Sequence, residues 1–281
     1  MNYRHHYHAG NFADVMKHVL LIGLLEGMRR KDTPFCYVDT HAGCGWYDLS
    51  EAPAQKTGEY KQGVKRLQPG KDNPPWVATW FAQLAAVRER EGGKGWYGGS
   101  PWYALQALRP QDRAALIELH PVDVEKLRKH TVGFPQVAVH HRDAYEGLLA
   151  LIPPKEKRGL VLIDPPYEEE RDDYPEVIEL LQKAVAKWPT GVFAVWYPIK
   201  DRTPIDRFHK KLIKTGIRKL LVCELCVMPD DNPLGLNGSG LVVVNPPWQF
   251  AEEADRVLQW MLPQLKEHRM SKATVKWLVG E

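Results

Sequence analysis

From residue 101 onward, short apolar runs alternate with segments of helical periodicity, and this alternation constrains the fold more than any other feature of the chain. The apolar runs have the length of strands and lie at residues 114–119, 137–141, 159–163, 192–197, 220–227, 241–244 and 273–279. The helical segments lie at residues 101–108, 122–130, 174–188, 205–215 and 252–267. Strands that alternate with helices predict an α/β fold with a doubly wound, mostly parallel sheet.

The first hundred residues begin in the same style and then change. Residues 14–30 carry apolar side chains at helical spacing, and residues 35–38 form an apolar run that ends before a glycine-rich loop. Between residues 50 and 99, prolines and glycines interrupt two predicted helices. We therefore predict one α/β domain made of residues 1–49 and 100–281, with a small inserted helical subdomain at residues 50–99.

The composition of the 281 residues is that of a globular protein, with 44% hydrophobic and 26% charged residues, and it excludes general disorder. No apolar run approaches the ~18–20 residues of a membrane span. Residues 1–11 are polar and rich in histidine, unlike a secretory signal. We therefore expect a cytoplasmic protein with no membrane partner. A monomer is the simplest expectation.

The formal net charge is only +3, so overall charge does not identify a nucleic-acid partner. Two local clusters carry more information. One consists of Lys17, Arg29, Arg30 and Lys31, and the other of Lys210, Lys211, Lys214, Arg218 and Lys219. Either cluster can contact phosphates or form an ordinary solvated helix face, and the sequence leaves both interpretations open.

Two groups of side chains could suggest a metal. Cys223 and Cys226 have C-x-x-C spacing, but they lie in a predicted strand, where residues three apart face opposite sides, and no second pair completes four ligands. His5, His6 and His8 are close in sequence, but no nearby carboxylate or cysteine completes a ligand set. We predict reduced, buried thiols and no metal.

Ligands of parallel sheets bind beyond the carboxyl ends of the strands, and unusual residues follow three strands here. The first strand leads into Asp39-Thr40-His41-Ala42-Gly43-Cys44-Gly45, whose glycines allow a tight turn and close approach to a ligand. Glu118 ends the second strand and can accept hydrogen bonds from ribose hydroxyls, and Asp143 after the third can hold an adenine amino group. Each acid taken alone is equally compatible with a helix cap. The loop lacks the full G-x-G-x-x-G spacing, which disfavours a nicotinamide dehydrogenase.

The tetrad Asp164-Pro165-Pro166-Tyr167 after the fourth strand is the strongest signal. An exocyclic amino group is a poor nucleophile because its lone pair is delocalised into the ring. A carboxylate and a fixed backbone carbonyl can accept its two hydrogens and direct the lone pair at an electrophilic methyl group. Prolines fix that backbone, and the aromatic residue can stack on a base removed from its helix. The alternative is a stiff turn with an ordinary acid.

A second motif, Asn245-Pro246-Pro247-Trp248, matches the same loose pattern. It follows a late strand, downstream of the glycine loop and both acids. The order of glycine loop, ribose acid, adenine acid and tetrad favours Asp164 as the functional residue. We therefore expect Asn245 to be structural or to line the rim of the pocket.

The order of these pieces resembles the S-adenosylmethionine-dependent amino-methyltransferases, and with the N-terminal residues included it resembles the RlmJ family over nearly the whole chain. The motifs that carry this resemblance are Tyr3-Arg4-His5, His8-Ala9-Gly10-Asn11-Phe12-Ala13-Asp14-Val15, Lys17-His18, Asp39-Thr40-His41-Ala42-Gly43, Gly98-Gly99-Ser100-Pro101, Glu118-Leu119-His120-Pro121, Ile163-Asp164-Pro165-Pro166-Tyr167, Trp196-Tyr197-Pro198, Thr215-Gly216-Ile217-Arg218-Lys219, and Gly238-Ser239-Gly240 followed by Asn245-Pro246-Pro247-Trp248.

The resemblance implies a Rossmann-like methyltransferase fold and methylation of N6 of an adenine in bacterial 23S rRNA, adenine 2030 in that family. It implies S-adenosylmethionine as cofactor and 23S rRNA, naked or in an early subunit precursor, as partner. Asp164 would be catalytic with Pro165 and Tyr167, and Tyr3 would contact the RNA. The cofactor contacts would be His18, His41, Ser100, Glu118, Asp143 and the backbone around Ala144, where the family usually has glycine.

In the mechanism that follows from the tetrad, the adenine stacks on Tyr167 while Asp164 and the carbonyl of Pro165 hold its N6 hydrogens. The same tetrad serves other planar amino groups, so DNA adenine and a protein glutamine amide are alternative acceptors. A non-catalytic rRNA-binding assembly factor is the alternative outside enzymes. The loop at residues 228–240 and the insertion are candidate RNA contacts by position alone.

Overall fold

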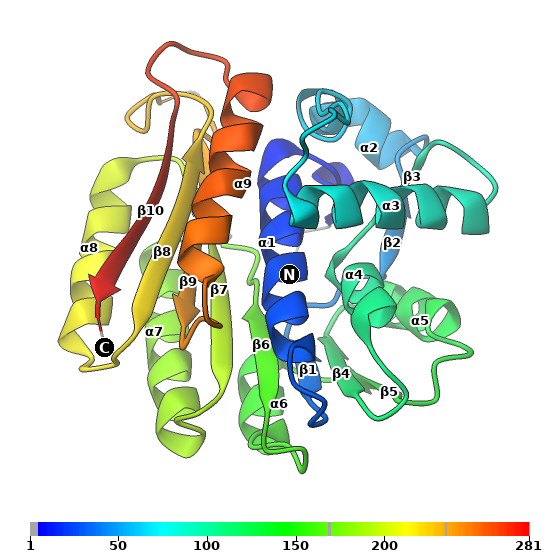
Figure 1. Cartoon of the computed structure of the whole chain (residues 1–281), viewed down its shortest axis with the longest axis vertical. Helices are drawn as coiled ribbons and strands as arrows, with labels where there is room; N and C mark the ends of the chain where they lie inside the picture. Colours follow the sequence, from blue (N-terminus) through cyan, green and yellow to red (C-terminus); the bar gives the residue numbers. More distant parts are fainter. Residues whose placement is uncertain (1–4, 168–169, 234, 281) are drawn as a thin grey trace.

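The computed structural model describes residues 5–167, 170–233 and 235–280, and within these it forms one large mixed sheet of eight strands (Figure 1). The strand order is β10-β8-β9-β7-β6-β1-β4-β5. Six strands run in the same direction: β1 (Cys36–Asp39), β4 (Arg113–Glu118), β5 (Val137–His141), β6 (Gly159–Ile163), β7 (Val192–Ile199) and β8 (Leu220–Cys226). Two run against them: β9 (Gly238–Val244) and β10 (Lys272–Val279). The predicted doubly wound, mostly parallel sheet is confirmed.

Helices cover both faces of this sheet (Figure 1). One face carries α1 (Phe12–Arg29), α4 (Ser100–Ala107), α5 (Pro121–His130) and α9 (Phe250–Leu265). The other carries α6 (Ala144–Leu151), α7 (Glu170–Lys187) and α8 (Arg202–Lys214). Among the described residues, no helix combines the length and the apolar character that crossing a bilayer requires.

Side chains alternate between the two cores along each buried strand, as the pleat of a β-strand requires. On β8, Cys223 packs in the core beneath α1 and α9, whereas Cys226 packs in the core beneath α7 and α8. Both thiols are free and buried. The two cysteines therefore face opposite sides, as their spacing within a strand predicts.

The segment between β1 and α4 contains the two predicted helices and a small sheet that the sequence does not predict. Its elements are β2 (Trp46–Asp48), α2 (Ala52–Thr57), the 3-10 helix η2 (Glu59–Gln62), α3 (Pro75–Arg90) and β3 (Trp96–Gly98), with β2 and β3 antiparallel. Strands of three residues are too short to show a period. Trp76 of α3 packs closely on Gly23 of α1, because a Cβ added to Gly23 would lie 2.5 Å from the Trp76 ring. The segment thus adds to the core above α1, and its separation as a subdomain stays a prediction.

Helix α6 is not among the helices predicted from the sequence, although Asp143 is compatible with a helix cap. This eight-residue helix contains Gly147, a poor helix former. Its start is fixed by the Asp143 side chain, which accepts hydrogen bonds from the backbone N–H groups of Tyr145 and Glu146. Gly147 also packs closely on the sheet, because a Cβ there would lie 3.0 Å from Cδ1 of Ile117. Capping and tertiary contact therefore override a weak local pattern.

The sheet topology fixes where a ligand can bind. The chain leaves β1 on one side toward β4 and β5 and continues on the other side with β6 and β7, so the strand order reverses between β1 and β6. Asp39 ends β1 and pairs with Leu162 of β6, which places Asp164 close by at the same end of the sheet. Binding crevices of open α/β sheets form at such a point.

Gly63 sits where the insertion meets the start of α1. A Cβ at this position would lie 2.1 Å from the carbonyl oxygen of Gly10 and 2.3 Å from the carbonyl carbon of Asn11, both backbone atoms that cannot rotate away. We predict that Gly63→Ala lowers the free energy of unfolding by about 1–3 kcal/mol, as overpacking does. Urea denaturation measures this. Gly93→Ala, whose Cβ would make an ordinary contact of 3.7 Å with Trp96, is the matched control. Equal stability of the two variants would contradict the prediction.

Candidate active site

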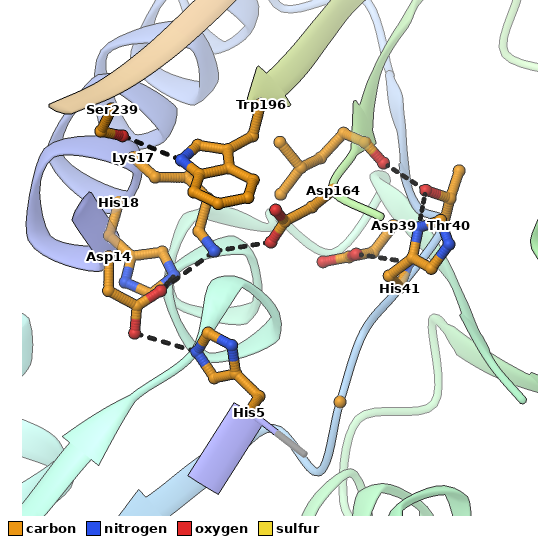
Figure 2. Close-up of polar contacts among 12 residues, drawn as sticks. His5, Asp14, Lys17, His18, Asp39, Thr40, His41, Asp164, Trp196 and Ser239 are labelled. Carbon is orange, nitrogen blue, oxygen red and sulfur yellow. Dashed lines mark hydrogen bonds and ion pairs between the residues drawn. The ribbon is translucent and has the colours of Figure 1, made fainter. Parts of the chain in front are cut away.

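Asp164, directly after β6, is held by an ion pair with Lys17 of α1 (Figure 2). The Nζ atom of Lys17 lies 2.5 Å from Oδ2 of Asp164 and 3.0 Å from Oδ1 of Asp14. The Lys17 side chain is only 4% exposed. Lys17 is therefore neither a phosphate contact at the surface nor part of a solvated helix face, the two interpretations that the sequence leaves open. Its spacing of three residues from Asp14 on a helix was the available signal.

Asp14 connects this ion pair to the N-terminal residues. It accepts hydrogen bonds from the backbone N–H of Gly10 and from Nε2 of His5, both at 3.0 Å. Burial favours the protonated form of Asp14, but the nearby charges of His5 and Lys17 outweigh this effect and hold its pKa well below the usual value. The structure thus places His5, in the 3-10 helix η1 (His5–Tyr7), beside the tetrad.

The other two N-terminal histidines have different neighbours. Nδ1 of His8 lies 2.9 Å from Oε1 of Glu59 in η2, which also accepts a hydrogen bond from the Asn11 side chain. The ring of His6 packs edge-on against Tyr47. Across the described ranges, no three histidine, cysteine or acidic side chains gather as metal ligands. The histidines instead attach the N-terminal residues to α1, to the insertion and to β2.

A cavity of about 220 Å³ opens at the carboxyl ends of β1, β4 and β6. All six residues that the family resemblance predicts as cofactor contacts line it: His18, His41, Ser100, Glu118, Asp143 and Ala144. Asp164 and Pro165 line it as well. Of these residues, His18 and Pro165 are 147 positions apart in sequence and are brought to one cavity.

Glu118 and Asp143 both accept hydrogen bonds from backbone N–H groups, and Asp143 caps a helix in this way. Glu118 accepts hydrogen bonds from the backbone N–H groups of Gly43 and His120, one at each carboxylate oxygen and both at 2.7 Å. Asp143 caps α6 through Oδ1 alone. A carboxylate oxygen has more than one lone pair, so both acids can still accept a hydrogen bond from a ligand in the cavity.

Burial keeps two histidines of this cavity, His18 and His41, neutral. It lowers the pKa of His18 to about 3 and that of His41 to about 4. Nδ1 of His18 lies 2.8 Å from the hydroxyl of Tyr97, which fixes the ring. Burial also raises the pKa of Asp39 to about 6. Near neutral pH both rings therefore act as uncharged hydrogen-bonding groups.

The remaining charges make the cavity negative. Six carboxylates line it, namely Glu118, Asp123, Asp143, Asp164, Asp173 and Glu176, against the single ammonium of Lys17 among its described lining residues. A cavity with this charge suits a ligand that carries positive groups. S-adenosylmethionine has a sulfonium and an ammonium, and it also offers ribose hydroxyls and an adenine amino group to the acids. The residues present therefore fit this cofactor.

A second, wider groove of about 920 Å³ meets the first cavity at Asp164. His5, Lys17, Asp164 and Pro166 line both spaces, and the groove continues along Trp196 and Lys200 toward the insertion. The Asp164 carboxylate therefore lies where a group in the cavity could meet a group in the groove.

Tyr167 and Trp196 both line this groove, but their exposure differs. Tyr167 is 2% exposed, and its hydroxyl donates a hydrogen bond of 2.7 Å to the carbonyl oxygen of Trp196. Trp196 is partly exposed, and its Nε1 donates to Oγ of Ser239 at 2.9 Å (Figure 2). The Lys17 ammonium lies 5.4 Å from the centroid of the Trp196 ring. Trp196, which the sequence singles out only through the family motif, thus offers the more accessible ring. Tyr3 lies outside the described residues.

Asn245 is structural. It follows β9, which runs against β7, so it lies at the opposite end of the sheet from Asp164. Its side-chain amide donates hydrogen bonds of 2.9 Å to the carbonyl oxygens of Pro189 and Gly191. It lines neither the cavity nor the groove. Of the two interpretations of Asn245, the position at the pocket rim is wrong.

Comparisons with known proteins agree with this geometry. A family model described as ribosomal RNA large subunit methyltransferase D, RlmJ, matches residues 32–279. Two curated relatives, both called ribosomal RNA large subunit methyltransferase J, from Haemophilus influenzae and Escherichia coli K12, are each 41% identical to this chain over 100% of both sequences. A crystal structure of protein LPL1258 from Legionella pneumophila str. Philadelphia 1 is 34% identical, with a TM-score of 0.85 over 96% of this chain and 98% of that one.

His18 makes stability depend on pH. Its pKa is about 3 in the folded protein, against 6.5 for an unperturbed histidine, so between these values the unfolded chain binds the extra proton. We predict that His18 alone makes the free energy of unfolding fall by about 1.4 kcal/mol per pH unit as the pH drops from about 6 to 4. Denaturation at several pH values, comparing the wild type with His18→Gln, measures this. The variant should show the smaller slope whatever its stability at pH 8. Identical slopes would refute the assignment.

Proposed function

This chain belongs to the RlmJ family of ribosomal RNA large subunit methyltransferases, and we propose that it transfers a methyl group from S-adenosylmethionine to N6 of an adenine in 23S rRNA. Membership in this family, together with the sheet topology, confirms the predicted Rossmann-like methyltransferase fold. The observation that carries the proposal is the position of Asp164 at the junction of the acidic cavity and the groove.

The cavity would hold the cofactor. Glu118 would accept hydrogen bonds from the ribose hydroxyls, and Asp143 would accept one from the adenine amino group through Oδ2. The neutral rings of His18 and His41 add no positive charge that would repel the sulfonium. When bound, S-adenosylmethionine supplies an electrophilic methyl group on that sulfonium.

The groove would hold the acceptor adenine with N6 at Asp164. The Asp164 carboxylate and the carbonyl oxygen of Pro165 would accept the two N6 hydrogens, which turns the nitrogen lone pair toward the cavity. Lys17 fixes the orientation of the carboxylate through the contact at Oδ2. The N6 proton leaves during or after methyl transfer, so the chain needs to supply positioning and electrostatics rather than a strong base.

The base itself needs an aromatic surface. Extruding an adenine from a stack costs roughly a few kcal/mol, which stacking on a protein side chain can offset. Tyr167 is covered by its neighbours, whereas the Trp196 ring borders the groove and is partly exposed. We therefore assign the stacking contact to the Trp196 ring. Tyr167 would support Trp196, because its hydroxyl donates a hydrogen bond to the Trp196 carbonyl oxygen.

Substitution of Asp164 tests the catalytic role. Asp164→Ala should lower methyl transfer at least about a hundredfold, because one hydrogen-bond acceptor at the reacting atom is lost, while S-adenosylmethionine binding stays nearly unchanged. The assay follows labelled methyl from S-adenosylmethionine into protein-free 23S rRNA from cells that lack the gene, with nucleoside analysis of the product. Asp206→Asn, an exposed acid on α8, is the control that should retain activity.

The same assay separates the alternatives. Label in N6-methyladenosine of 23S rRNA supports the proposal. Label only in DNA or in protein would transfer the assignment to those acceptors. Calorimetry that detects no binding of S-adenosylmethionine to the wild type would leave a non-catalytic RNA-binding factor. Wild-type turnover by Asp164→Ala would remove Asp164 from the mechanism.

Substitution of Trp196 tests the stacking of the acceptor base. Trp196→Ala should raise KM for RNA about tenfold, because stacking on one base is worth about 1–3 kcal/mol, and should leave cofactor affinity unchanged. Trp196→Phe keeps an aromatic ring and should recover most of the RNA affinity. If Trp196→Phe raised KM as much as Trp196→Ala, the stacking role of Trp196 would be wrong.

A further inference from the structure

Trp248 is the most exposed of the large hydrophobic side chains in the described chain, at 82% of its surface. It ends the tetrad Asn245-Pro246-Pro247-Trp248, which lies between β9 and α9 and plays no part in the candidate active site. A single exposed apolar side chain is ordinary by itself. The loop that carries Trp248 is firmly held.

Three contacts fix this loop. The Asn245 amide is bonded to two carbonyl oxygens in the turn before β7, as described above. Pro247 packs against Gly27 of α1 so closely that a Cβ on Gly27 would lie 2.5 Å from Cβ of Pro247. Nη1 of Arg30 donates a hydrogen bond of 2.7 Å to the carbonyl oxygen of Trp248 itself. The backbone is thus held in place while the indole ring is left to solvent.

The C-terminal end of α1, where Arg30 contacts Trp248, is rich in cations. Arg29, Arg30 and Lys31 are exposed at the end of α1 and form no ion pair with any described residue. Arg158 donates to the carbonyl oxygens of Met28 and Thr33 in the same segment, so a fourth cation borders it.

Acids are present nearby but fewer. Asp32 lies in the segment after α1, and Glu252 and Glu253 follow in the first turn of α9, where Glu253 pairs with Arg256. Basic residues at a helix C-terminus also interact favourably with the helix dipole, which accounts for part of the cluster. The dipole does not account for a rigidly held, exposed tryptophan beside it.

We propose that Trp248 and the cations Arg29, Arg30 and Lys31 form a second RNA contact, in which the indole stacks on an unpaired base and the cations bind the flanking phosphates. Aromatic rings next to cations are the usual platform for single-stranded RNA, because every base has a stacking face. The inference rests on the proposed function only in that the partner is the RNA substrate.

This contact would lie far from the methylated adenine. Asp164 follows the carboxyl end of β6, whereas Asn245 lies at the amino end of its neighbour β7. The five residues of β6 alone span about 16 Å. An RNA shorter than this separation cannot occupy the groove and Trp248 together, whereas a long rRNA domain can. The second contact would therefore favour the large substrate over small fragments.

The experiment compares two RNAs. Trp248→Ala should raise Kd for protein-free 23S rRNA about tenfold, while Kd for a short hairpin carrying the methylated adenine and kcat on that hairpin stay unchanged. Trp248→Tyr should restore binding because it restores a stacking surface. Replacing Arg29 and Lys31 by Gln should reduce the magnitude of the slope of log K against log[salt] by about 1.5–2. Arg30 is left in place because it holds the loop.

Matched controls separate this site from general surface effects. Trp277→Ala removes another exposed tryptophan, 48% exposed on β10, and a Lys210→Gln, Lys211→Gln pair removes two exposed cations of α8. Both should leave the 23S rRNA affinity and its salt dependence near the wild type. The inference would be overturned if Trp248→Ala bound 23S rRNA as tightly as the wild type, or if the controls or the hairpin showed an equal loss of affinity. Methylation of RNA by the wild type would still support the proposed function in that case. A wild type that methylates no RNA would instead overturn the proposed function.

Discussion

The ammonium of Lys17 stands between the carboxylates of Asp14 and Asp164, and the organisation of the site depends on this contact. It joins α1 to the end of β6 across 147 positions of sequence. A buried charge is tolerated only when it is paired, and removal of one partner from such a pair typically costs about 3–5 kcal/mol. The contact therefore holds the tetrad in one orientation before any ligand arrives, which is the preorganisation that electrostatic catalysis requires.

The sheet determines what lies on either side of that contact. Because the strand order reverses between β1 and β6, the loops after these strands diverge and leave a crevice. The glycine loop, Glu118 and Asp143 border it on the β4 and β5 side, and Trp196 of β7 borders the groove on the other. The cavity and the groove meet at Asp164, so the sheet topology itself places this carboxylate where the two spaces join.

Much of this could be predicted from the sequence, and the exceptions share a physical cause. Strands that alternate with helices have strong periodic patterns, and the tetrad with Asp164 is a rare local motif. The spacing from Asp14 is a signal for one partner of Lys17, but the contact with Asp164 could not be recognised, because a lysine on a helix looks the same whether it is solvated or faces a carboxylate that is distant in sequence. The exposure of Trp196, the burial of Tyr167 and the pairing of the short strands β2 and β3 are likewise decided by tertiary contacts.

The Glu59 carboxylate of the insertion forms hydrogen bonds with the side chains of both His8 and Asn11. The N-terminal residues, the start of α1 and the insertion therefore meet at one carboxylate. In evolutionary terms, such a junction couples mutations. A relative that loses the acid at position 59 leaves two polar groups at positions 8 and 11 without their shared partner, and a compensating change there becomes favourable. Positions some fifty residues apart should therefore exchange amino acids together among homologues, although none of them lies in a strand of the sheet.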